Sequence, residues 1–242
     1  MSAAGLGTLV RRMVSTNDLE DGEKAALGKL PFTLASLAPQ QDVVREGDRP
    51  TRSCLLLEGY LFTSKHIAED RRQITSIYVA GDIPDLQSVH LEIMDMTLTS
   101  FTHCKVAYIQ HSAIKTLCLE NPRLALAFWR STLIDAAMYR EWIANVGQRS
   151  ALSRTAHLMC ELLTRLKAVG LSDGTSCDLP TTQTELADAL GLSAVHMSRV
   201  LRDMRADGLI QLRGRRLTAL KPAALAEVGD FDPTYLHLRE KL

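Results

Sequence analysis

The sequence predicts an α+β fold in which an antiparallel β-roll is followed by a long helix and a C-terminal domain of short helices with a β-hairpin. Short apolar runs separated by Gly, Pro, Asp and Asn occupy residues 32–109, a pattern typical of antiparallel strands. Helical spacing of apolar side chains returns over residues 121–146, and signals for two capped helices and a hairpin fill residues 182–220. A chain of 242 residues is long enough for two domains built from these elements.

The N-terminal segment, residues 6–30, is expected to be helical, with the acidic side chains of Asp18, Glu20, Asp21 and Glu23 exposed. The strands should follow it. Arg71 and Arg72 fall between two apolar runs and are expected at a solvated hairpin tip. Strands at such close spacing predict a β-sandwich or roll. The apolar runs cover residues 42–44, 54–57, 60–62, 74–79, 96–98 and 106–109.

A long helix is predicted after Asn121, because Pro122 suits the first helical turn. Its apolar side chains recur at a rough spacing of three to four but fall on more than one side, which favours a dimer interface. The alternative is a helix that packs only on its own β-domain. Residues 147–150 are the expected hinge, and a helix over residues 152–167 begins the second domain. The side chains along the helix, with two polar interruptions, are Leu124, Phe128, Ser131, Asp135, Met138 and Trp142.

Residues 182–206 contain the signals of two short crossed helices. Thr182 and Glu185 form a Thr-x-x-Glu capping box, so a helix should begin at Thr182. Gly191 ends that helix and permits a tight turn, and Ser193 can cap the second helix. The spacing therefore predicts a helix-turn-helix.

The second helix of the pair has one apolar face and one basic face. The positions at i, i+3, i+4 and i+7 from Met197 are apolar and predict a buried stripe. The opposite face carries Val195, Ser198, Arg199 and Arg202. This face suits a DNA major groove, because Arg can donate two hydrogen bonds to one guanine. The alternative is a small helical domain whose arginine face is merely solvated.

A β-hairpin is predicted after the helix pair, from apolar runs on either side of Gly214. Arg213, Arg215 and Arg216 surround its turn, and such a wing suits contacts with DNA phosphates. Residues 193–221 hold seven basic and two acidic residues, a balance of +5, whereas the whole chain has 28 of each sign. Positive charge is thus concentrated where DNA contact is predicted.

The predicted DNA-binding residues form two groups. The groove should be faced by Ser193, Val195, Ser198, Arg199 and Arg202, with His196 completing the set on the same helix. Phosphates, which position a protein without reading sequence, should be bound by Thr182, Gln183, Arg213 and Arg215.

The order of a β-roll, a long helix and a winged helix-turn-helix resembles the CRP/FNR superfamily of bacterial transcription regulators over nearly the whole chain. The matching pieces are Arg45-Glu46-Gly47-Asp48, Leu57-Glu58-Gly59, Gly81-Asp82 and the segment from Thr182 to Ile210. The resemblance implies a cyclic nucleotide-binding-like sensory roll and a homodimer that binds a palindromic promoter site on double-stranded DNA. Half-sites would lie about one helical turn apart, and RNA polymerase is a further expected partner.

The effector segment departs from the pattern of the resemblance. Cyclic-AMP-binding members carry Gly-Glu-Leu and, further on, Arg-Ser, which hold the ribose and cyclic phosphate. Here residues 81–88 read Gly-Asp-Ile-Pro-Asp-Leu-Gln-Ser, and the Arg-Ser positions are Met96 and Thr97. A buried phosphate without arginine would lack its charge partner, so we do not expect cyclic AMP. We do not expect the FNR iron–sulfur cluster either, because the first cysteine is Cys54. The effector itself stays unknown.

The second helix of the helix-turn-helix, which would read the DNA bases, also departs from the pattern of the superfamily. Many members carry Glu-x-x-Ser-Arg; Ser198 and Arg199 match its last two residues, while Val195 replaces the Glu. A carboxylate there would accept a hydrogen bond from cytosine N4, whereas valine can only make an apolar contact, for instance with a thymine methyl. The hypothesis is that Arg199 reads a guanine and that the position normally read by Glu is relaxed or shifted toward thymine.

We expect a sensory domain over residues 1–120, a dimerisation helix and hinge over 121–149, and a DNA-binding domain over 150–242. Five scattered cysteines favour reduced thiols in a cytoplasmic protein. No apolar run is long enough to span a bilayer, and no secretory signal follows Arg11 and Arg12, so no membrane partner is expected.

An enzyme is not predicted, because the sequence lacks a Gly-x-Ser-x-Gly motif, a phosphate-binding loop and a clustered acid–base pair. The alternative is a haem- or metal-dependent sensor or enzyme on a β-roll scaffold. Candidate haem ligands are His90, His103 and His111. His157 and Cys160 lie three residues apart on one helix and could share a metal, but no second pair lies at metal-site spacing.

Overall fold

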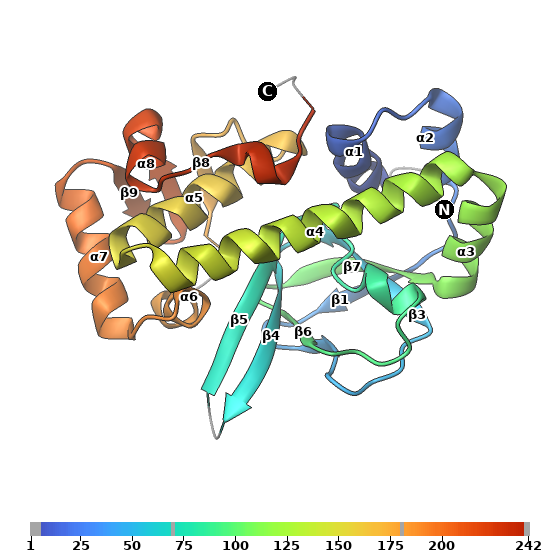
Figure 1. The fold of residues 1–242 in the computed structure, drawn as a ribbon, viewed down its shortest axis with the longest axis horizontal. Coiled ribbons are helices and arrows are strands. Elements are labelled where there is room, and N and C mark those ends of the chain that lie inside the picture. Colours follow the sequence, from blue (N-terminus) through green and yellow to red (C-terminus); the bar gives the residue numbers. More distant parts are fainter. Residues whose placement is uncertain (1–5, 69–70, 180–181, 240–242) are drawn as a thin grey trace.

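The computed structural model describes residues 6–68, 71–179 and 182–239. One long helix, α4 (Pro122–Gln148), crosses the molecule and connects a β-roll to a C-terminal group of short helices and strands (Figure 1). No helix among the described residues is long and apolar enough to cross a membrane.

The roll, residues 33–110, consists of two antiparallel sheets with strand orders β1-β7-β3 and β2-β6-β4-β5. Successive side chains on β3 enter different cores, because strand side chains alternate between faces. Leu55 packs against the surrounding helices, whereas Leu56 lies between the two sheets. The strands are β1 (Thr33–Leu37), β2 (Asp42–Val44), β3 (Arg52–Glu58), β4 (Leu61–Ala68), β5 (Arg71–Tyr78), β6 (Thr97–Ser100) and β7 (Cys104–Gln110), with the short 3-10 helix η2 (Leu86–Val89) between β5 and β6.

Three helices flank the roll: α1 (Gly7–Thr16), α2 (Asp21–Gly28) and α3 (His111–Glu120). The single helical segment predicted at the N-terminus is wrong in this respect, because the backbone becomes extended at Asn17. Glu20 then starts a new helix through a capping box with Glu23. The expected exposure of Glu23 is wrong, because its side chain is buried in this capping interaction. Helix α3 has no counterpart in the prediction.

Helix α4 begins with Pro122 in its first turn, as predicted, and its 27 residues extend about 40 Å. One side buries Phe128, Met138 and Trp142 against the rest of the chain. Another side leaves four large apolar side chains exposed: Leu126, Trp129, Leu133 and Ile143. The helix ends at Gln148, inside the predicted hinge, and Ser150 caps the next helix.

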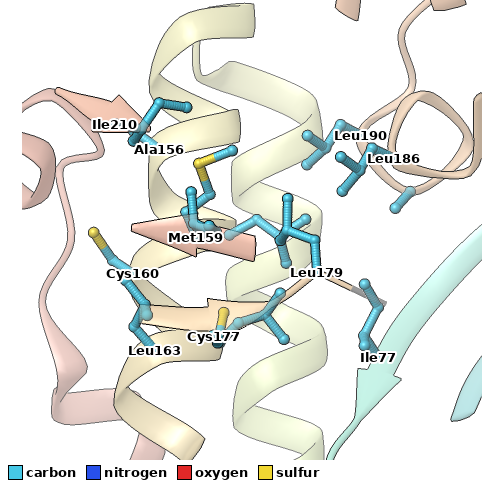
Figure 2. Packing of buried hydrophobic residues seen from close by; sticks show 14 of the residues in the cluster. Ile77, Ala156, Met159, Cys160, Leu163, Cys177, Leu179, Leu186, Leu190 and Ile210 are labelled. Carbon is cyan, nitrogen blue, oxygen red and sulfur yellow. The ribbon is translucent and has the colours of Figure 1, made fainter. Parts of the chain in front are cut away.

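The head, residues 151–228, is built around helix α5 (Ala151–Ala168). Figure 2 shows Met159, Cys160 and Leu163 of α5 in one core with Leu186 and Leu190 of the following helix and Ile77 of the roll. The roll and the head therefore share a hydrophobic core. The remaining elements are β8 (Ser176–Asp178), α6 (Gln183–Leu190), α7 (Ala194–Ala206), β9 (Ile210–Arg213), β10 (Arg216–Ala219) and α8 (Pro222–Val228).

Two further features differ from expectation. Strand β8 extends the predicted hairpin into a three-stranded sheet, β8-β10-β9. The expected solvated position of Arg72 is wrong, because its guanidinium donates to the carboxylate of Asp188 on α6 at 3.0 Å. The β4–β5 hairpin thus leans against the head.

Candidate DNA interface

The first helix of the predicted pair begins where the sequence indicates. Thr182 Oγ1 accepts from the Glu185 amide at 3.3 Å, and Glu185 Oε2 accepts from the Thr182 amide at 2.7 Å. Helix α6 ends at Gly191, which has a φ of +62° and donates its amide to Ala187. This left-handed conformation favours glycine and sets the tight turn into the next helix.

The second helix, α7, presents the two predicted faces. Ser193 caps it by accepting from the His196 amide at 3.2 Å. The apolar stripe is buried in the head core, with Met197 and Met204 fully enclosed. The opposite face is open to solvent, and Val195 retains 64% of its accessible surface there.

The arginines of α7 differ in their partners. Arg199 is exposed and makes no hydrogen bond or ion pair with the described part of the chain. Arg202 contacts the carboxylate of its neighbour Asp203 at 3.3 Å, on the surface. Arg205 donates to the carbonyl of Leu201 at 3.1 Å. Arg199 is therefore the arginine of this helix with its whole donor fork available for a partner outside the chain.

The predicted wing is a tight hairpin in which Arg213 pairs with Arg216 across the turn. Gly214 has a φ of +58° at this turn, which again favours glycine. Arg216 is held toward β8, because its guanidinium donates to Ser176 Oγ at 2.6 Å and Asp178 at 3.3 Å. The Arg216 side chain is thus directed toward β8 and is paired within the chain.

All ten predicted DNA-binding residues are exposed, and they belong to three neighbouring elements of the head. They lie at the N-terminal end of α6 (Thr182, Gln183), on α7 and its cap (Ser193, Val195, His196, Ser198, Arg199, Arg202) and on the hairpin (Arg213, Arg215). Helix α7 lies at the outer end of the molecule, away from the roll (Figure 1).

Arg154 has a positioning role that sequence reasoning missed. It lies on α5, where its guanidinium donates to the carbonyl of Leu190 at 2.8 Å and to that of Arg149 at 2.8 Å. It therefore ties the C-terminal end of α6 to the hinge. The sequence offers no signal for this contact, because an arginine near the start of a helix usually faces solvent.

A second candidate site is a cavity of about 680 Å³ between the roll and α4. Apolar groups from β5, from the segments on either side of η2 and from α4 form most of its lining. Met96, at the position where the resemblance calls for arginine, lies on its wall. Lys65 also lines it but is paired with Glu46 at 2.7 Å. Burial raises the pKa of the lining residue Asp135 to about 7.

The candidate haem and metal ligands are not brought together. None of the described residues that line the cavity is a histidine. His111 Nε2 shares a hydrogen bond with Ser88 at 3.0 Å, and His157 is buried beside Gly229 and Tyr235. The described residues contain no group of three or more His, Cys, Asp or Glu side chains placed to hold a metal ion.

Comparison with known proteins shows which domain family the head resembles. The Crp-like helix-turn-helix domain family matches residues 153–228. The transcriptional activator protein FnrL of Cereibacter sphaeroides is 25% identical over 198 residues, covering 78% of each chain. The nitrogen fixation regulation protein FixK of Azorhizobium caulinodans is 23% identical over 197 residues, covering 81% of this chain and 77% of that protein.

The same architecture occurs in solved structures. FixK2 from Bradyrhizobium japonicum superposes with a TM-score of 0.75 at 19% identity, covering 82% of this chain and 98% of that chain. The c-di-GMP-responsive regulator CLP of Xanthomonas campestris superposes with a TM-score of 0.61 at 18% identity, covering 88% and 98%.

Proposed function

We propose that this chain, a DNA-binding transcription regulator of the CRP/FNR type, binds a palindromic promoter site as a homodimer. The observation that supports the proposal is the exposed face of α7, where Arg199 has no partner among the described residues. The superfamily consists of regulators and not enzymes, and we propose no catalytic activity. RNA polymerase is the further partner that we propose.

The proposed reading residues are those of α7, with Arg199 donating to guanine O6 and N7. The Val195 side chain would contact a thymine methyl at the neighbouring position. Thr182 and Gln183, at the positive end of the α6 dipole, and Arg213 and Arg215 would bind phosphates.

The proposed dimer interface is the exposed apolar side of α4. Leu126, Trp129 and Leu133 are separated by three and four residues, and Ile143 follows ten residues after Leu133. This spacing repeats every 3.5 residues, which is the seam of two helices that supercoil around each other. A second copy of the chain would cover these side chains and place two heads on one DNA site.

The test is selection of bound duplexes from a random library at a stated salt concentration. We expect the wild type to enrich a palindrome, and Arg199→Ala to lose a guanine in each half-site. Arg205→Ala is the matched control, because it removes the same charge from the last turn of α7. The absence of an enriched palindrome, or a guanine preference that survives in Arg199→Ala, would contradict the proposal.

We also propose that the roll is sensory and that its ligand occupies the cavity beside α4. A volume of about 680 Å³ is in the range of small-molecule sites. The lining favours an apolar ligand with a hydrogen-bond donor, because Asp135 makes no hydrogen bond to the described residues. In the cytoplasm, where we place the protein, its five free cysteines would stay reduced.

N-phenyl-1-naphthylamine, which is apolar and has one N–H, is a suitable fluorescent probe for this cavity. We expect it to bind the wild type and to bind much more weakly to Ala136→Phe, which fills the cavity. Cyclic AMP should not displace it. Equal probe binding by both proteins would refute a ligand site at this position.

A further inference from the structure

Three segments of the chain meet at one buried carboxylate. Asp82, in the turn after β5, accepts from Arg12 of α1 at 2.8 Å and from Arg165 of α5 at 2.7 Å. It also accepts from the amide of Val79 at 2.9 Å. A residue of the roll is therefore ion-paired with both the N-terminal helix and the head.

The buried network continues from Arg165 into the head. Arg165 donates to the carbonyl of Ile77 at 2.8 Å and to Glu161 at 3.1 Å. Glu161, which is fully buried, also accepts from the indole N–H of Trp142 on α4 at 3.1 Å. The roll, α4 and the head are thus joined through side chains that have little access to water.

The strap, residues 229–239, supplies the last partner of this network. The hydroxyl of Tyr235, in the 3-10 helix η3 (Pro233–Leu236), donates to Glu161 at 2.8 Å and lies 3.1 Å from His157 Nε2. Leu236 is buried against Ile134 and Met138 of α4.

The strap then reaches the N-terminal helix. Arg239 donates its amide to the carbonyl of Ser15 at 2.8 Å, and its guanidinium contacts Asn17 and Asp18 at 2.9 and 2.6 Å. The strap therefore runs from the head along α4 to α1, as Figure 1 shows.

We propose that the strap completes a brace, which is the buried network of Asp82, Arg165, Glu161 and Tyr235. This brace fixes the head on α4 in its DNA-binding orientation. Rotation of the head would separate Asp82 from Arg165 and leave buried charges without partners, which is strongly unfavourable. In the braced arrangement the reading face of α7 stays uncovered by the roll, as the exposure of Val195 indicates. The inference rests on the proposed dimeric DNA binding, because a fixed head matters most when two half-sites must be met at once.

The test compares the wild type with Tyr235→Phe, which removes one hydroxyl, and with Leu236→Asn, which loosens the strap from α4. Tyr108→Phe is the matched control, because Tyr108 is half-buried in the roll and its hydroxyl has no hydrogen bond to the described residues. Circular dichroism checks that each variant is folded. Affinity is measured by anisotropy for a full palindrome and for a single half-site.

We expect the two strap variants to bind the palindrome at least about fivefold more weakly and the half-site within about twofold of wild type. Unchanged palindrome affinity would overturn the brace. Tighter palindrome binding would overturn it as well, because the strap would then restrain the head in an inactive orientation.

A second measurement is independent of DNA. Spin labels on cysteines introduced at the exposed positions Lys105 and Glu227, in a Cys118→Ser background, report the distance between roll and head. We expect one narrow distance in the wild type and a broader distribution in both strap variants. A narrow distribution in all proteins would refute the brace. A wild type that fails to prefer the palindrome over the half-site, yet shows this broadening in the variants, would refute only the dimeric DNA-binding proposal.

Discussion

Arg199 of α7 and Arg165 of α5 both belong to the head, and they show what an arginine does in an exposed and in a buried position. Arg199 faces solvent with no partner in the described chain, whereas Arg165 is almost fully buried and donates to Asp82, Glu161 and the carbonyl of Ile77. The donors of Arg199 are available for a ligand, whereas the Nη1 and Nη2 donors of Arg165 form hydrogen bonds within the protein. The exposed face of α7 is thus available to a ligand, whereas Arg165 of α5 attaches the head to the roll.

Removing the buried arginine should have the largest effect on stability. Arg165→Met leaves Asp82 and Glu161 with fewer cationic partners in the interior, so we expect the free energy of unfolding to fall by about 3–5 kcal/mol. Urea denaturation measures it. Arg199→Met is the control and should change stability by less than about 0.5 kcal/mol. Comparable losses of unfolding free energy in the two variants would contradict this difference between the buried and the exposed arginine.

Removing the exposed arginine should instead affect recognition. Arg199→Ala is expected to weaken binding to the selected palindrome by about 1–3 kcal/mol and to relax one position in each half-site. Competition between the palindrome and a duplex altered at that position measures the loss. Uniform weakening across all sequences would assign Arg199 to phosphate contact.

Two buried acids outside the head, Asp135 of α4 and Asp82 of the roll, should respond to pH in opposite ways. Burial raises the pKa of Asp135 to about 7, so its folded state binds the proton more tightly than the unfolded chain, where the pKa is about 3.9. Stability from this group is present at low pH and is lost as pH rises from about 4 to about 7. Asp135→Asn should therefore raise the free energy of unfolding at pH 8, by roughly 1–2 kcal/mol, and change it little at pH 4.

Asp82 supplies the opposite case. Burial opposes its ionisation, but the charges of Arg165 and Arg12 outweigh burial and lower its pKa. Its stabilisation is present above the unfolded pKa and is lost as pH falls through the folded value. Asp82→Asn should destabilise the protein at pH 8, and the deficit should shrink in strong acid. Urea denaturation of both Asn variants across pH measures these changes in the free energy of unfolding. Changes of the same sign in the two variants at pH 8 would contradict the prediction.

The smallest effect is expected at the wing. Arg216 is half-exposed and bridges to Asp178, so Arg216→Ala should cost at most roughly 0.5 kcal/mol of stability. Because its guanidinium is drawn toward β8, its loss should leave the salt dependence of DNA binding nearly unchanged. Arg213→Ala, on the other strand of the wing, should reduce the salt slope by about 1. Equal slopes would mean that the two arginines play the same part.

The elements that sequence predicts well are those fixed by neighbours in the chain. The capping box at Thr182, the left-handed Gly191 and the buried stripe of α7 are all confirmed, because each depends on residues within one or two turns. The resemblance to the CRP/FNR superfamily is confirmed by the comparisons. The base and phosphate contacts of the ten residues stay predictions.

The features that sequence misses depend on partners far along the chain. Asp82 and Arg165 are separated by 83 residues, and neither differs in its local pattern from a solvated charge. Arg72 looks like a hairpin-tip residue until the head brings Asp188 against it. Strand β8 is only three residues long, Ser-Cys-Asp, and forms because β10 offers it an edge.

The strap has a consequence for the order in which the protein matures. Its residues leave the ribosome only after the roll, α4 and the head have been synthesised and can fold. Until Leu236 emerges, Ile134 and Met138 lack their cover, and until Tyr235 emerges, Glu161 lacks one of its donors. The head of a nascent chain is therefore complete before the proposed brace can close, and emergence of the strap is the step that would fix its orientation.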